Sequence, residues 1–211
     1  MLAKDILFWN VDTQIDFMSK TGKLYVSDAE QIQPTLAQLS SFAKRHNIQV
    51  VNTADFHYSN SKELSQSPDF ITTFPPHCMA NTSGAEYVNE TKPETPFSEV
   101  LWENNYSDKE ISAITAHRNI VIRKDAFDVF EGNKYTNAIL KQIAPKTVFV
   151  YGVSTNVCVD CAVVGLAKQN IKVYVIEDAI KELPNIPLPY AKWEQLGVKK
   201  ITFSEINNYI N

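Results

Sequence analysis

Short apolar runs rich in β-branched and aromatic residues recur along the chain, with helical stretches between them. The runs cover residues 6–11, 48–52, 120–122, 147–151, 173–176 and, more weakly, 200–203. Runs this short and apolar are typical of strands that are buried on both faces of a parallel sheet. A chain of 211 residues is long enough for one sizeable core. The alternation therefore predicts a single α/β domain over residues 1–211, with helices covering both faces of a parallel sheet.

The helical stretches are marked by apolar spacing and by capping residues. They are predicted around residues 36–43, from the capping box Ser107–Glu110, over residues 138–144 and over residues 156–168. The segment from about Asp55 to Trp102 contains five prolines and reads as a long loop. Long loops inside compact domains are usually functional, and ligands of such sheets bind outside the carboxyl ends of the strands.

Charge and composition exclude several classes of partner. The formal net charge is −4, and lysines and arginines are scattered without a basic run that could follow a phosphate backbone or an anionic membrane. No apolar stretch approaches the roughly 20 residues that span a bilayer, and the first residues do not resemble a secretion signal. We expect a cytoplasmic protein that binds neither nucleic acid nor membrane. Its three cysteines favour thiol chemistry or packing over a disulfide framework.

Cys158 is the candidate nucleophile. It follows a predicted strand at the start of a helix, where the helix dipole and a nearby cation would lower the pKa of a thiol, and where free N–H groups could stabilise an oxyanion. A buried core cysteine is an equally simple interpretation of the position. A third is a dithiol oxidoreductase built on Cys158 and Cys161, although no thioredoxin-like pattern follows the pair.

Asp12 and Lys124 also stand where strands end. A partly desolvated carboxylate at Asp12 would suit a general base that later acts as an acid, and Lys124 could supply a cation between acid and thiol. The simpler interpretations are a hydrogen-bonded turn aspartate and a solvated surface lysine.

Asp55, His57 and His77 form a candidate metal site in the long loop. Asp55 and His57 are two residues apart, so an extended chain places both on one side, and His77 lies further along. Three protein ligands with open positions are typical of a catalytic metal site. Glu63, between them, is a further candidate ligand.

Taken together, these motifs resemble the isochorismatase-like cysteine hydrolases and, within them, the nicotinamidases. The matching segments, in order, are Asp12-x-Gln14-x-Asp16-Phe17, Asp55-Phe56-His57, Pro75-Pro76-His77-Cys78, Ser83-Gly84-Ala85-Glu86, Lys124, Gly152-Val153-Ser154-Thr155-Asn156-Val157-Cys158-Val159 and Val175-Ile176-Glu177-Asp178-Ala179. Each segment alone is weak, but the ordered set covers nearly the whole chain and is specific.

The resemblance implies a fold, a site and a reaction. It implies a Rossmann-like sheet of six parallel strands, a catalytic triad of Cys158, Asp12 and Lys124, and a cis peptide between Val153 and Ser154. The further roles that it implies are an oxyanion hole from the N–H groups of Ser154 and Cys158, substrate contacts from Phe17 and Phe74, and one divalent metal on Asp55, His57 and His77. Zinc is the favoured metal, with iron and manganese as alternatives. The implied substrate is a small amide, nicotinamide, hydrolysed through a thioester for NAD salvage, and a homo-oligomer is one option for the assembly.

Departures from the family pattern leave the identity of the amide open. Asn81 stands where the family commonly has glycine, and Cys161 stands where threonine is usual. Asp125 and Asp128 follow Lys124 in place of small residues, and we expect them to alter what the pocket accepts. The rival hypotheses are a related amidase with another small substrate, the dithiol oxidoreductase, and a silent protein that binds without turnover.

Overall fold

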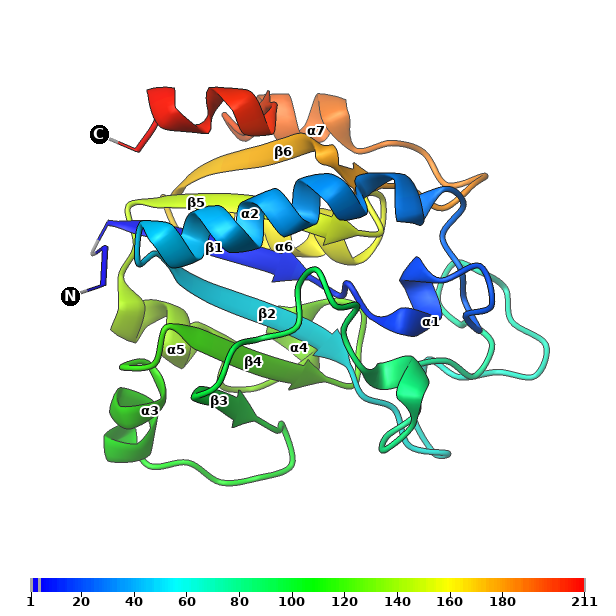
Figure 1. Ribbon diagram of the computed structural model, residues 1–211. Coiled ribbons are helices and arrows are strands. Elements are labelled where there is room, and N and C mark those ends of the chain that lie inside the picture. The colour runs from blue at the N-terminus through cyan, green and yellow to red at the C-terminus, as the bar shows by residue number, and fades with distance from the viewer. Residues whose placement is uncertain (1, 4, 211) are drawn as a thin grey trace.

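The structure is a computed structural model that describes residues 2, 3 and 5–210. Its centre is one parallel sheet of seven strands in the order β3-β4-β2-β1-β5-β6-β7 (Figure 1). The strands are β1 Ile6–Val11, β2 Gln49–Asp55, β3 Phe97–Val100, β4 Asn119–Lys124, β5 Thr147–Val153, β6 Lys172–Lys181 and β7 Lys199–Ile201. The predicted α/β class and parallel sheet are confirmed.

The predicted number of six strands is wrong, because β3 lies inside the segment that reads as a long loop. Three of its four residues are exposed or half-buried, and it pairs only with β4 at the sheet edge. An edge strand with polar side chains has no apolar run by which the sequence would reveal it. Without β3, the other six strands follow the order of the doubly wound dinucleotide-binding folds.

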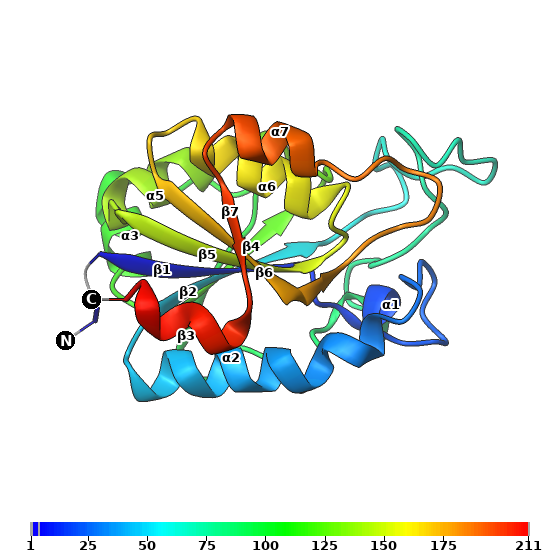
Figure 2. The ribbon, with the colours of Figure 1, turned by 90° about the horizontal axis from the view of Figure 1, so that it is seen from above.

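Helices cover both faces of the sheet, as the alternation of runs predicts. They are α1 Ile15–Met18, α2 Gln33–Arg45, α3 Asp108–Ile114, α4 Val129–Gly132, α5 Thr136–Ile143, α6 Cys158–Ala167 and α7 Tyr190–Gln195, with 3₁₀ turns η1 Ala29–Ile32, η2 Ser83–Ala85 and η3 Phe203–Asn208. Figure 2 shows α2 and η3 on one face and α5, α6 and α7 on the other. The capping box at Ser107 is present. Within the described ranges, no helix has the length and apolar character needed to cross a bilayer.

Two apolar layers hold the sheet between the helices. Along β1, Leu7 and Trp9 belong to the layer beneath α6, whereas Phe8 belongs to the layer beneath α2. This alternation follows from the period of two in a strand, and burial on both faces explains why the run contains almost no polar residue. Because the strands are parallel, their carboxyl ends lie at one edge, toward the side where α1 and the long loop lie in Figure 1.

Candidate active site

Cys158, Lys124 and Asp12 meet at the carboxyl edge of the sheet, although they come from α6, β4 and the end of β1. Nζ of Lys124 lies 3.8 Å from Sγ of Cys158 and 2.9 Å from Oδ2 of Asp12. The sulfur of Cys158 also lies within 4.8 Å of a carboxylate oxygen of both Asp12 and Asp55. The structure therefore brings the three predicted catalytic side chains within reach of one another.

All three catalytic candidates are buried, so their charges must compensate one another. Lys124 is fully buried and forms ion pairs with both Asp12 and Asp55. Oδ1 of Asp12 accepts a hydrogen bond of 2.6 Å from the hydroxyl of Thr53. The ion pairs keep Lys124 from being an unpaired buried cation, which would be costly.

Burial and the charges of neighbouring side chains shift the pKa values of these groups in opposite directions. Burial raises the pKa of the Cys158 thiol well above its ordinary value, against the opposing effect of Lys124. Burial likewise raises the pKa of Asp12. Burial lowers the pKa of Lys124, but Asp12 and Asp55 outweigh that effect and hold it well above its usual range. The arrangement therefore places the thiol beside a carboxyl group that can act as a base and beside a lysine whose charge two aspartates stabilise.

The backbone before Cys158 leaves two donors free. The peptide between Val153 and Ser154 is cis, as the resemblance implies. Within the described part of the chain, the N–H groups of Ser154 and Cys158 donate to no protein acceptor. Gly152 has a φ of 119°, and a Cβ there would lie 2.0 Å from the carbonyl oxygen of Val11. Only glycine therefore lets β5 run this close to β1 on the way to the turn.

Asp55, His57 and His77 form a compact cluster of ligand atoms next to the triad. Oδ2 of Asp55 lies 3.8 Å from Nε2 of His57 and 3.5 Å from Nε2 of His77, and the three side chains are buried. Burial raises the pKa of Asp55, but Lys124 and the two histidines outweigh it and hold that pKa well below its usual value. Burial lowers the pKa of His57, but the hydrogen bond to Asp125 and the nearby carboxylate of Asp55 raise it to about 9.

The hydrogen bonds of the two histidines leave both Nε2 atoms facing Asp55. Nδ1 of His77 lies 2.7 Å from the carbonyl oxygen of Pro75, which can only accept, so Nδ1 carries the hydrogen. Nδ1 of His57 lies 2.9 Å from Oδ1 of Asp125. Nε2 of His57 is buried and has no hydrogen-bond partner among the described residues. A divalent cation fits this donor set, because it would give the buried Nε2 of His57 a partner and because imidazole nitrogens and a carboxylate are ligands that such ions accept.

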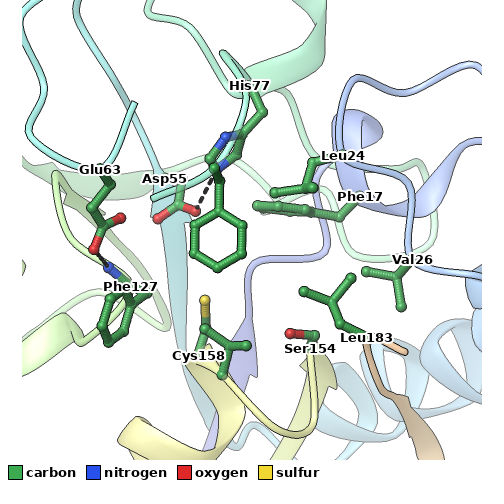
Figure 3. A pocket seen from close by; sticks show the side chains of 12 residues that line it. Phe17, Leu24, Val26, Asp55, Glu63, His77, Phe127, Ser154, Cys158 and Leu183 are labelled. Atoms are coloured by element: carbon green, nitrogen blue, oxygen red, sulfur yellow. Dashed lines mark hydrogen bonds and ion pairs between the residues drawn. The ribbon is translucent and has the colours of Figure 1, made fainter. Parts of the chain in front are cut away.

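A cavity lined by Cys158, Asp55 and His77 lies between the triad and this cluster. Figure 3 shows Cys158 on one side, with Asp55 and His77 on the other. Phe17 and Phe74 both line the cavity, and their ring centroids lie 5.3 Å and 6.2 Å from that of His77. The two rings are therefore placed where substrate contacts are predicted.

Glu63 lines the cavity but does not join the ligand cluster. Its Oε1 accepts a hydrogen bond of 2.6 Å from the N–H of Phe127, and burial raises its pKa to about 7. Among the described residues, Glu63 belongs to neither of the two groups of possible ligand atoms, which are Asp55, His57 and His77, and Asp12, Asp55 and Cys158. Asp125 and Asp128 are not among the residues that line the cavity, so the sequence interpretation of both as shaping the pocket finds no support.

Gln14 and Asp16 hold the backbone beside the candidate metal ligands, a role that the sequence analysis did not assign to them. The Gln14 amide donates to the carbonyl oxygens of Asp55 and Ala85 and accepts from the N–H of Asp55. The Asp16 carboxylate accepts from the N–H of Cys78, directly after His77. Both side chains form hydrogen bonds with backbone groups far along the chain. In the sequence, only the spacing of Gln14 and Asp16 within the first motif could have indicated this role.

Asn81 lies in the loop after His77, at a position where the family commonly has glycine. Its φ is 61°, in the left-handed region that glycine adopts at no steric cost and asparagine more readily than most residues. The asparagine therefore takes the conformation that the usual glycine would allow.

Comparisons with known proteins bear on the family resemblance. The isochorismatase domain pattern matches residues 103–187. The nicotinamidase of Acinetobacter baylyi is 29% identical, over 93% of this chain and 92% of that protein. The pyrazinamidase of Pyrococcus horikoshii, solved in complex with zinc, superposes with a TM-score of 0.72 at 25% identity, covering 94% of this chain and 99% of that one.

A second solved structure shows the same fold. The nicotinamidase and pyrazinamidase of Acinetobacter baumannii superposes with a TM-score of 0.73 at 23% identity, covering 96% of this chain and 98% of that one. The resemblance predicted from the motifs is thus confirmed: residues 103–187 match the isochorismatase domain pattern, and the chain is similar over nearly its whole length to a nicotinamidase.

Proposed function

We propose that the protein is a metal-dependent cysteine amidohydrolase that converts nicotinamide and water to nicotinate and ammonia, a reaction of NAD salvage. The observation that carries the proposal is the thiol of Cys158, 3.8 Å from Lys124, on the wall of a cavity that faces an Asp/His/His cluster. The similarity to a nicotinamidase over 93% of the chain supports the same activity.

We expect the cavity to accept a single flat ring with a carboxamide. Phe17 and Phe74 supply apolar faces for the ring, and stacking of this kind contributes about 1 kcal/mol beyond burial. Asp55, His57 and His77 would hold a divalent metal, and zinc accompanies a similar pyrazinamidase. When bound, the metal supplies a Lewis-acid contact to the ring nitrogen, which orients the substrate.

In the first half of the reaction, Cys158 forms a thioester and ammonia leaves. Asp12 takes the thiol proton as the sulfur attacks the carboxamide carbon, and Lys124 stabilises the negative charge. The carbonyl electron pair moves to oxygen, where the free N–H groups of Ser154 and Cys158 can donate to it. The C–N bond then breaks as Asp12 gives its proton to the nitrogen.

In the second half, water replaces the sulfur. Asp12 accepts a proton as water attacks the thioester carbon, and the same N–H groups again receive the oxyanion. The C–S bond breaks, the acid leaves, and the proton on Asp12 returns to the sulfur of Cys158. A carboxylate whose pKa burial has raised is suited to carrying one proton in both directions.

The test is ammonia release from nicotinamide by the wild type and Cys158→Ala in parallel. We expect turnover by the wild type and a loss of at least about 10³-fold in the variant, because no other group replaces the nucleophile. Mass spectrometry of the quenched wild-type reaction should show Cys158 carrying a nicotinoyl group.

Unchanged turnover by Cys158→Ala would contradict the mechanism. A wild type that is inactive on nicotinamide but releases ammonia from another small carboxamide in a substrate panel would keep the mechanism and replace the substrate.

A further inference from the structure

We propose that Asp125 is a positioning residue of the metal site, which fixes the orientation of His57 and adds a second carboxylate charge behind it. The proposal rests on the metal site of the proposed function. Asp125 itself lies outside the lining of the cavity and so acts only through His57.

The contacts of Asp125 converge on a single oxygen. Its Oδ1 accepts from Nδ1 of His57 at 2.9 Å and from the hydroxyl of Ser61. The Ser61 oxygen in turn accepts from the N–H of Tyr58 at 2.9 Å. The imidazole of His57 is therefore held from behind by a carboxylate that is itself held by a serine from the same loop.

The backbone of Asp125 is fixed as well. Its N–H donates to the carbonyl oxygen of Gly132 at 3.3 Å, and the preceding residue, Lys124, accepts from the N–H of Phe56. A Cβ at Gly132 would lie 2.8 Å from the backbone nitrogen of Ala126. The turn after β4 is thus packed closely against α4, and it delivers the carboxylate to a defined place.

The second histidine offers an internal comparison. His77 donates from Nδ1 to the neutral carbonyl oxygen of Pro75 at 2.7 Å, whereas His57 donates to a carboxylate. A carboxylate behind a metal-bound imidazole sets the tautomer and raises the basicity of the nitrogen that faces the metal. His57 should therefore be the stronger of the two imidazole ligands, and its strength should depend on the charge at Asp125.

The experiment measures Zn²⁺ affinity of the folded protein by competition with a chromophoric chelator, without any substrate. Asp125→Asn keeps the size of the side chain and one acceptor oxygen but removes the charge. We expect it to weaken Zn²⁺ binding by about 10- to 100-fold. Asp128→Asn is the matched control, because Asp128 lies in the same segment and its carboxylate caps α4 through the N–H of Phe130, whereas Nδ1 of His57 bonds to Asp125.

An NMR measurement distinguishes a positioning role of Asp125 from a general loosening of the metal site. In the zinc-loaded protein, we expect the Nδ1–H resonance of His57 to move upfield in Asp125→Asn while that of His77 stays in place. Ser61→Ala removes the hydroxyl that donates to Asp125 and so tests the same carboxylate by a second substitution. We expect Ser61→Ala to weaken Zn²⁺ binding by less than Asp125→Asn does.

Two results would overturn the proposal. Asp125→Asn could bind Zn²⁺ as tightly as the wild type, or Asp128→Asn could lose as much affinity. In both cases a wild type that still binds Zn²⁺ and hydrolyses nicotinamide leaves the proposed function standing. Failure of the wild type to bind Zn²⁺ would instead remove the metal site itself.

Discussion

The two sides of the cavity differ in how their buried polar groups are compensated. On the side of Cys158, the chain supplies both signs of charge, because Lys124 pairs with Asp12 and Asp55. On the opposite side, Nε2 of His57 and of His77 face Oδ2 of Asp55 at 3.8 Å and 3.5 Å, and the His57 nitrogen has no hydrogen-bond partner in the described part of the chain.

This difference supports the proposal that a cation binds on the ligand side, whereas on the nucleophilic side the chain itself supplies the compensating charge. Asp55 belongs to both sides, since one oxygen contacts Lys124 and the other faces the histidines. We therefore expect the reactivity of the thiol and the binding of metal to be separable by mutation everywhere except at this shared ion pair.

The largest effect is expected from Lys124→Met, which removes the shared cation. Asp12 and Asp55 would remain as buried carboxylates without the cation between them, and breaking a buried ion pair in this way costs about 3–5 kcal/mol. The free energy of unfolding, measured in urea, should fall by this amount, and ammonia release should fall by at least about 100-fold. Lys109→Met, at an exposed position of α3, is the control. A stable Lys124→Met variant would mean that the two carboxylates need no cation between them.

The regular part of the fold could be predicted because its strands are apolar runs buried on both faces. The same rule explains why the sequence does not predict β3. Phe97 is exposed and its neighbours are polar, so β3 forms a strand only by pairing with β4. Tertiary pairing of this kind leaves no periodicity to detect.

The residues of the site also divide into those that the sequence predicts and those whose role it does not predict. Cys158, Asp12, Lys124 and the three metal-ligand candidates stand at strand ends or in recognisable motifs, and geometry brought them together as predicted. The sequence predicts that Asp125 alters the pocket, but Asp125 bonds to His57, which lies 68 positions earlier in the chain. Hydrogen bonds of such long sequence separation depend on the final packing, so no spacing in the sequence indicates them.

His77→Ala tests whether the two sides are separable. It removes one metal ligand, so we expect Zn²⁺ affinity and amidase activity to fall by at least about 100-fold. The rate of Cys158 alkylation by iodoacetamide, followed by peptide mass spectrometry, should stay within about 3-fold because the triad is intact. His46→Ala, at the end of α2, is the control. A parallel loss of thiol reactivity would show that the sides are coupled beyond Asp55.

A smaller effect on the metal side is expected from Gly84→Ala. A Cβ at Gly84 would lie 2.1 Å from Oδ2 of Asp16, and that oxygen accepts the N–H of Cys78 next to His77. Displacing the carboxylate should shift the loop and weaken Zn²⁺ binding by about 10-fold, again with alkylation of Cys158 unchanged. Wild-type affinity would mean that the loop holds His77 without Asp16.

The smallest effect is expected from Cys161→Ala, which tests whether the nucleophilic side needs a second thiol. Cys161 lies less than one helical turn after Cys158 on α6, lines a separate cavity and carries no disulfide. Burial raises the pKa of its thiol to about 12, so it holds little thiolate at neutral pH. An amidase should keep its activity within about 2-fold, measured as ammonia release. A dithiol oxidoreductase would lose all activity, and a large loss here would therefore mean that Cys158 works with a neighbouring sulfur rather than with Asp12 and Lys124.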